Sequence, residues 1–158
     1  MKVLVLLIVD DAMILPSLSK ILRNNLDIQI MNVSFVGSRA LEDSLPAGQA
    51  NGIGVSQVVP FPWDRWIPVV AEYQQLMRST KTDASFSFTS LEGFIAAKLM
   101  TEALERAGPN PTRERLLKAL KTIKVLNADG MTFDLTDSDN QASDYVELTF
   151  FGAQRWEP

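Results

Sequence analysis

The amino end of the chain is a run of apolar residues that stops at two carboxylates. Residues 3–9 are all apolar, and Asp10 and Asp11 follow directly. An unbroken apolar run of this length is typical of a strand that is buried on both faces of a parallel sheet. It falls well short of the roughly 20 residues that span a bilayer, and a signal peptide would need a small-residue cleavage site. The pattern therefore predicts a buried strand.

Helical and strand patterns alternate over the next fifty residues. Residues 14–25 repeat apolar side chains at helical spacing, and 39–44 fit a short second helix. Residues 28–35 and 53–59 fit two further strands. A β-α-β-α order favours a parallel sheet with right-handed crossovers. The predicted fold class is α/β, with a Rossmann-like parallel sheet and flanking helices.

Three helical patterns then follow without a strand between them, over residues 67–77, 89–107 and 112–123. Thr89 and Glu92 are spaced as a capping box for the second helix, and Thr112 is placed to cap the third. Each pattern carries an apolar stripe. The stripes could pack on one another, but we expect them to cover a sheet whose strands are not in this chain, and an uncovered apolar face marks an interface.

Two short strands are predicted near the carboxyl end, over residues 131–135 and 145–151. The second of them alternates Val146, Leu148 and Phe150 with Glu147 and Thr149. Alternation of this kind predicts an edge strand or a half-exposed strand.

Composition excludes several classes of function. The chain has 158 residues, no His, no Cys and a formal net charge of −4. Without His or Cys it lacks the usual general base, the thiolate nucleophile and the commonest zinc ligands, so we expect no enzyme, no metal and no cofactor. The acidic balance also argues against a nucleic-acid partner.

Two segments are candidates for chemistry. Asp10 and Asp11 after an apolar strand resemble the start of a phosphoacceptor receiver domain, in which paired carboxylates hold magnesium. Neither later strand ends in the acceptor Asp that this alternative needs. Residues 32–38 follow a predicted parallel strand and lead into a helix, where open α/β sheets bind ligands; an ordinary strand-to-helix turn is the alternative.

A family resemblance rests on two further segments. Residues 52–64 read GIGVSQVVPFPWD, and residues 85–98 read SFSFTSLEGFIAAK. Together they resemble the carboxyl-terminal half of a type I periplasmic solute-binding protein of the branched-chain amino-acid type, the receptor of an ABC importer. The similarity extends from about Val5 to Trp156. It implies a two-lobe fold in which residues 1–57 form a second-lobe segment, 58–130 cross the hinge into first-lobe helices, and 131–158 return to the second lobe.

The resemblance also implies the site. Ser34 stands where branched-chain receptors have a Glu that faces the ligand's ammonium group, which opens the site to aromatic acids, amides and other small polar solutes. Asp10 falls at a second-lobe contact that is often Tyr. Phe35 neighbours Ser34, and Phe86 falls near an apolar wall of the first lobe. The implied ligand is an amino acid or a related small solute held between the lobes.

The implied partners are that solute and a membrane permease, and a homodimer through exposed helical faces is a further expectation. Receptors of this family are periplasmic. Because this sequence shows no signal peptide and no amino-terminal lobe, we expect it to stay cytoplasmic if expressed as given. The alternatives are a receiver-like or sensor signalling domain, and a truncated remnant that binds nothing.

Overall fold

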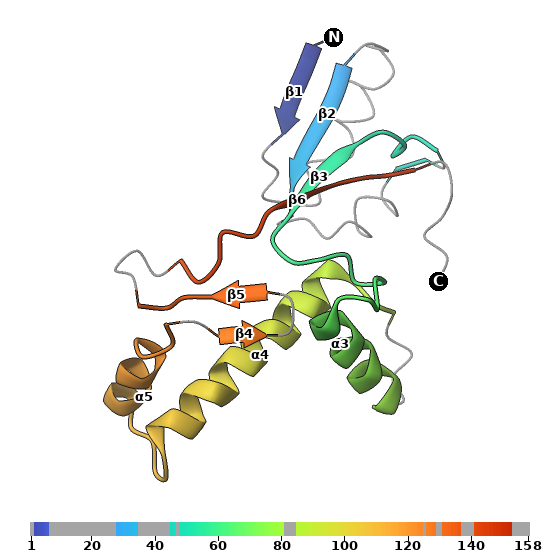
Figure 1. Cartoon of the computed structure of the whole chain (residues 1–158). Coiled ribbons are helices and arrows are strands. Elements are labelled where there is room, and N and C mark those ends of the chain that lie inside the picture. Colours follow the sequence, from blue (N-terminus) through green and yellow to red (C-terminus); the bar gives the residue numbers. More distant parts are fainter. Residues whose placement is uncertain are drawn as a thin grey trace. The chain divides into compact units, whose positions relative to one another are not determined.

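The computed structural model describes residues 2–6, 28–34, 45–46, 48–80, 85–124, 126–128, 131–136 and 141–152 (Figure 1). The chain divides into two compact units. The first consists of Met1–Val58 with Val146–Pro158, and the second of Val59–Tyr145. Each unit is described by itself below. The predicted helices over 14–25 and 39–44 lie outside the described residues.

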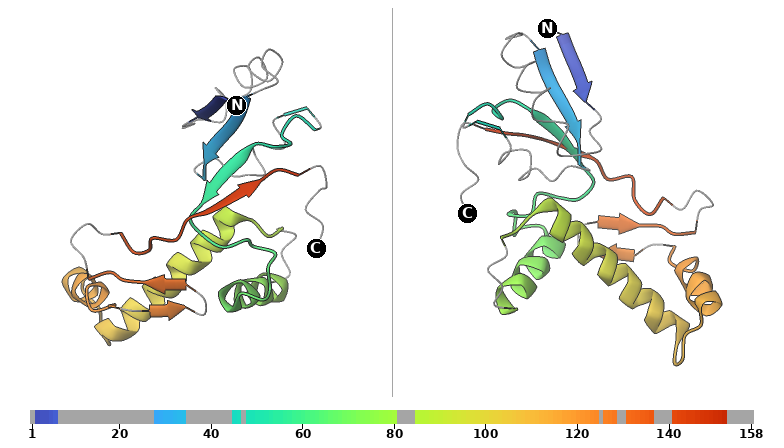
Figure 2. Two further views of the ribbon diagram at one scale, coloured as in Figure 1. Left: turned by 45° about the horizontal axis from the view of Figure 1, so that its top comes forward. Right: turned by 180° about the vertical axis from the view of Figure 1, so that it is seen from behind.

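The first unit is built on a four-stranded sheet in the order β1-β2-β3-β6 (Figures 1 and 2). Its strands are β1 (Lys2–Leu6), β2 (Ile28–Val33), β3 (Gly54–Gln57) and β6 (Glu147–Phe150). The first three are parallel, and β6 runs antiparallel to β3. The predicted α/β class with a parallel sheet is confirmed for β1 to β3, and β6 makes the sheet mixed.

The two faces of this sheet differ in burial. On one face Ile30, Asn32, Val55 and Gln57 are all buried. On the other, Leu148 is 56% exposed and Phe150 is 48% exposed. The prediction of a half-exposed edge strand is confirmed, and its apolar side chains lie on the more exposed face.

Gly54 is needed where β3 passes under two side chains of that exposed face. A Cβ atom at Gly54 would lie 2.5 Å from Met31 Sδ and 2.9 Å from Phe150 Cε1. Real Cβ atoms essentially never make contacts shorter than 3.0 Å. Only glycine lets Met31 and Phe150 pack on the strand in this way.

The second unit contains three helices and a short hairpin. The helices are α3 (Pro68–Ser79), α4 (Phe88–Ala107) and α5 (Arg113–Leu120), and the hairpin pairs β4 (Leu126–Ala128) with β5 (Met131–Phe133). All three predicted helices are confirmed, as is a strand starting at Met131. The sequence did not reveal β4.

The caps explain where the helices begin and end. Thr112 caps α5 as predicted, accepting a hydrogen bond from the Arg115 backbone N–H at 3.2 Å. The predicted capping box at Thr89 is wrong, because the N-cap of α4 is Ser87, whose hydroxyl accepts from Ser90 N–H at 3.1 Å. Gly108, with φ of 74°, ends α4 in the left-handed region that glycine tolerates.

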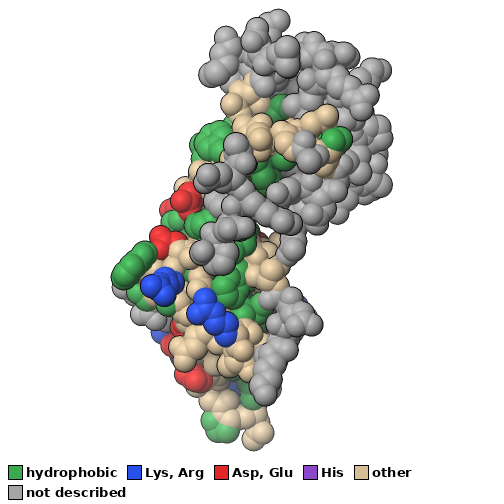
Figure 3. Space-filling view, turned by 90° about the vertical axis from the view of Figure 1, so that its right-hand side faces the viewer, with side chains coloured by type: hydrophobic (Ala, Val, Ile, Leu, Met, Phe, Trp, Pro, Cys, Tyr) green, Lys and Arg blue, Asp and Glu red, His purple; other side chains and the backbone are tan. Residues whose placement is uncertain are grey.

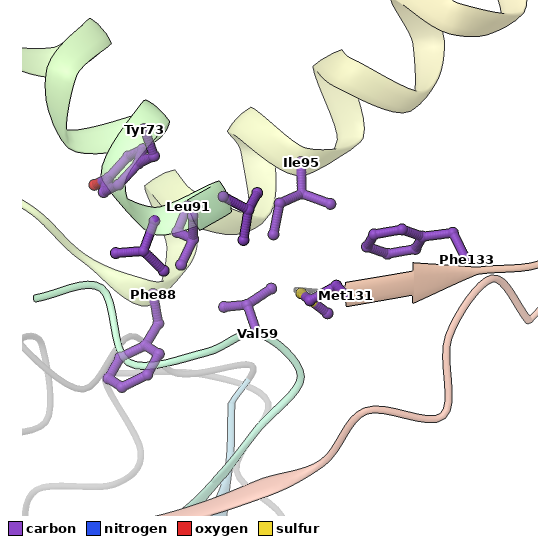
Figure 4. Packing of buried hydrophobic residues seen from close by; sticks show 9 residues of the cluster. Val59, Tyr73, Phe88, Leu91, Ile95, Met131 and Phe133 are labelled. Carbon is purple, nitrogen blue, oxygen red and sulfur yellow. The ribbon is translucent and has the colours of Figure 1, made fainter. Parts of the chain in front are cut away.

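The core of the second unit joins α3, α4 and the hairpin (Figure 4). Nine buried side chains form it: Val59, Val69, Val70, Tyr73, Phe88, Leu91, Ile95, Met131 and Phe133. The apolar stripe of α4 is therefore covered inside the unit, and our expectation that it lacks cover is wrong. The reason is that the segment after β3 and strand β5 supply the missing apolar partners.

Candidate functional site

The carboxyl ends of β1, β2 and β3 lie at one edge of the first sheet because the three strands are parallel. Leu6, Asn32 and Val55 are register partners across them. Side chains two positions apart on a strand share a face. Ser34 and Gln57 therefore follow Asn32 and Val55 on the same face, towards the strand ends. Ser34, one of the predicted ligand residues, is a partly buried turn residue just past β2.

Polar side chains gather on this face of the sheet. Asn32 is 3% exposed and Gln57 is 1% exposed. Gln57 Nε2 donates a long hydrogen bond of 3.4 Å to Thr149 Oγ1, on the antiparallel neighbour β6. Buried side-chain amides are uncommon, and most of those that occur are hydrogen-bonded. Gln57 and Thr149 thus extend the polar region from β2 across to β6.

Asn32 has no such partner. Within the described part of the chain, neither its Nδ2 nor its Oδ1 atom has a hydrogen-bond partner. An unsatisfied buried amide costs free energy and calls for an explanation. Asn32 lies at the start of the predicted loop 32–38 and on β2 in the structure, and nothing in its local sequence shows that it is buried.

Phe86 lies in the second unit, directly before the N-cap of α4. Its ring centroid is 5.6 Å from that of Tyr73, and the Arg78 guanidinium carbon lies 5.5 Å from the ring centroid. Phe86 is half-buried and packs against the core cluster. The ring is thus an apolar surface at the start of α4, and its role as a wall of a ligand site stays a prediction.

A hydroxyl network that the sequence did not predict lies beside Phe86. The Tyr73 hydroxyl is 2.5 Å from Ser90 Oγ and accepts a hydrogen bond from the Ser87 N–H at 3.1 Å. Tyr73 is 1% exposed. The network fixes the first turn of α4 against α3, and with it the position of Phe86.

The loop over residues 60–67 is held by packing and by α3. Phe61, Trp63 and Phe88 form a ring cluster with centroids 5.0 to 6.2 Å apart. The buried Gln74 Nε2 donates to the Pro62 carbonyl at 2.9 Å. Trp63 therefore packs within this cluster, whereas Trp66 is 84% exposed.

Asp134 has a pKa below its usual value, chiefly because the Thr136 hydroxyl and backbone N–H donate to its carboxylate. No cluster of metal-ligating side chains occurs in the described ranges. Charges of both signs are interspersed with apolar side chains on the face of the second unit seen in Figure 3. That face has no single-sign patch.

The four predicted site residues have different outcomes. Ser34 lies in the first unit and Phe86 in the second. Asp10 and Phe35 lie outside the described residues. A site that uses all four residues stays a prediction, and so do the three lobe segments with bounds 1–57, 58–130 and 131–158. No helix in the described ranges has the length and apolar character required to cross a membrane.

Several solved structures are similar to this chain. A "possible leucine/isoleucine/valine-binding protein" from Rhodopirellula baltica is 34% identical with a TM-score of 0.78, over 86% of this chain and 37% of that chain. A substrate-binding periplasmic protein from Ralstonia solanacearum is 29% identical with a TM-score of 0.77, over 87% of this chain and 40% of that one. An extracellular ligand-binding receptor from Verminephrobacter eiseniae shares the fold. It is 23% identical with a TM-score of 0.78, over 94% of this chain and 42% of that chain.

These proteins are named as binding proteins and receptors rather than as enzymes. The chain spans about two fifths of their length. No curated protein sequence matches it. The receiver-like alternative, which depended on Asp10 and Asp11, finds no support in these similarities. A family model described as periplasmic binding protein matches residues 2–150, and the chain therefore belongs to the periplasmic binding protein family.

Proposed function

We propose that the chain is part of the solute receptor of an ABC importer and that it binds an amino acid or a similar small polar or aromatic solute. Family membership is the observation that carries this proposal. The polar face at the carboxyl ends of β2 and β3 supports it, since ligands of open α/β sheets bind outside such strand ends. The name of the Rhodopirellula baltica protein favours an aliphatic amino acid. Ser34 has no negative charge to pair with an ammonium group, which favours a ligand that lacks a positive charge at that position.

In the proposed receptor, the two units correspond to parts of two lobes that close on the solute as a hinge. Ser34 would contact a polar group of the solute, and Phe86 would supply an apolar wall. Asp10 and Phe35 are proposed as further contacts on the side of Ser34. The receptor would act in the periplasm and deliver its solute to a membrane permease.

A thermal-shift screen of the purified chain tests the proposal. The panel holds free amino acids, aromatic acids, amides and short polyols. A ligand that binds only the folded state stabilises it by about 2.7 kcal/mol at one hundred times its Kd, so a true ligand raises the midpoint in a dose-dependent way. A cooperative transition that no compound in the panel moves would contradict the proposal.

Variants locate the site once a ligand is found. Ser34→Ala and Phe86→Leu should weaken binding about tenfold or more, the equivalent of about 1.4 kcal/mol each. Ser79→Ala is the control, because its exposed hydroxyl bonds only to the Leu76 carbonyl within α3. Equal affinities for all three variants would remove Ser34 and Phe86 from the site.

A homodimer is the second part of the proposal. Five exposed residues without charge share one side of α4: Gly93, Ala96, Ala97, Met100 and Leu104. Small residues allow the backbones of two helices to approach closely, and Met100 and Leu104 supply apolar area. Light scattering at micromolar concentration should give a dimer mass that Leu104→Glu reduces to a monomer mass. A strictly monomeric parent chain would rule the dimer out.

A further inference from the structure

Asn32 is a buried amide at the place where the proposed receptor would meet its ligand. It lies on β2, two positions before Ser34, and 3% of its surface is exposed. Among the described residues, neither polar atom of its side chain is hydrogen-bonded. A sheet position of this kind ordinarily holds an apolar residue, as Ile30 and Val55 do on the same face.

We propose that Asn32 forms the floor of a ligand subsite and that this subsite takes a neutral group that both donates and accepts hydrogen bonds, foremost a carboxamide. The proposal rests on the proposed function and goes beyond it by naming the chemical class of the bound group. Exposure rises from Asn32 to the partly buried Ser34, so the subsite opens towards the strand ends.

The chemistry of the Asn32 side chain selects this class. Its Nδ2 group offers two donors and its Oδ1 atom is an acceptor. A carboxylate has only acceptors and would leave Oδ1 unpaired, while an ammonium group has only donors and would leave Nδ2 unpaired. A carboxamide presents one carbonyl and one N–H₂ group, so it satisfies both atoms at once. A hydroxyl does so less well, because its one oxygen atom must both donate to Oδ1 and accept from Nδ2.

The neighbouring residues agree with a neutral group. Gln57, on the adjacent strand β3, is an amide on the same face, and Thr149, on β6 beyond it, is a hydroxyl. Glu147, the register partner of Gln57, brings a carboxylate to this face on β6, two strands away from Asn32. Ser34 adds a further hydroxyl. Burial strengthens hydrogen bonds and makes an unpaired charge costly. The described groups on β2 and β3 therefore match a ligand that brings hydrogen bonds rather than charge.

Binding to matched pairs of compounds tests the proposal on the intact chain. The pairs are asparagine with aspartate, glutamine with glutamate, and benzamide with benzoate, measured by isothermal titration. We expect at least one amide to bind about tenfold or more tightly than its acid. Asn32→Leu should abolish that preference.

Gln49→Leu is the matched control. Its Oε1 atom is also buried without a hydrogen-bond partner, but Gln49 lies in the turn before β3, at the opposite end of that strand. Removing either amide should raise the unfolding midpoint if each is merely an unsatisfied group. Only Asn32→Leu should change the preference between an amide and its acid.

The outcomes separate this inference from the proposed function. If compounds bind the parent chain with no preference for the amide, or if Asn32→Leu leaves the preference intact, the subsite is refuted and the receptor function stands. If no compound in either the pairs or the wider panel binds, the receptor function is refuted and the subsite falls with it. Loss of the preference in Asn32→Leu but not in Gln49→Leu supports the subsite.

Discussion

Replacing Tyr73 by phenylalanine removes one hydroxyl from the second unit and leaves the ring in place. The hydroxyl takes part in two hydrogen bonds, with Ser90 Oγ at 2.5 Å and with Ser87 N–H at 3.1 Å. Tyr73 is 1% exposed, so water does not readily replace these bonds. At about 1 kcal/mol net for each hydrogen bond, we expect Tyr73→Phe to lower the free energy of unfolding by about 2 kcal/mol.

Urea unfolding followed by tryptophan fluorescence measures the effect. The midpoint should fall while the slope of free energy against urea stays unchanged. Ser90→Ala removes the same bond from the other side, so the double variant should lose about 1 kcal/mol less than the sum of the single losses.

The control is Thr101→Ala, whose hydroxyl bonds to the Ala97 carbonyl on the exposed side of α4. It should change stability by less than about 0.5 kcal/mol. If Tyr73→Phe and Ser90→Ala were additive within about 0.3 kcal/mol, the two hydroxyls would not be coupled, and the network would not explain how α4 is fixed.

Three further predictions use other parts of the chain. Ser87→Ala should cost about 1 kcal/mol of stability because it removes a true N-cap, whereas Thr89→Ala should cost less than about 0.5 kcal/mol; equal losses in urea unfolding would contradict the assignment of the cap. Gly54→Ala should destabilise the chain by about 1–3 kcal/mol through overpacking, and an unchanged stability would show that Met31 and Phe150 move aside freely. Gly93→Ala should stabilise the chain by about 0.5–1 kcal/mol, since a Cβ atom at Gly93 meets no atom within 4 Å. The pKa of Asp134 is lowered in the folded chain, so its contribution to stability is present above the usual pKa of an aspartate and is lost as pH falls through the folded pKa; the stability difference between Asp134→Asn and the parent should therefore shrink in acid, and a difference that does not change with pH would refute this.

Local signals were enough for most elements of the second unit. Thr112 and Gly108 mark helix ends through side-chain capping and positive φ, which depend on few neighbours. The start of α4 was misassigned because Ser87 and Thr89 both have capping chemistry at suitable spacing. Phe88 packs in the core as the first residue of α4, so the helix begins two residues earlier than predicted and Ser87 is its N-cap. Strand β4 has only three residues and forms through its pairing with β5, so its own sequence carries too little signal.

The residues of the candidate site also differ in how far the sequence could predict them. The sequence was sufficient to place Ser34 at the end of a parallel strand and Phe86 before a helix, because strand and helix periodicity extend up to those residues. It could not distinguish Asn32 from an ordinary loop residue, since burial depends on what packs against the strand and not on the strand itself.

The sequence by itself therefore determined the type of most of the described helices and strands and the cap of α5, because these follow from local backbone preferences and from the period of the apolar positions. The family was indicated by the resemblance of residues 52–64 and 85–98 to periplasmic solute-binding proteins, and the family model confirms it. The tertiary structure alone decided that β6 pairs antiparallel with β3, that the stripe of α4 is covered within its own unit, and that the amide of Asn32 is buried without a partner. Each of these depends on contacts between segments far apart in the chain, for which the local pattern of residues holds no physical information.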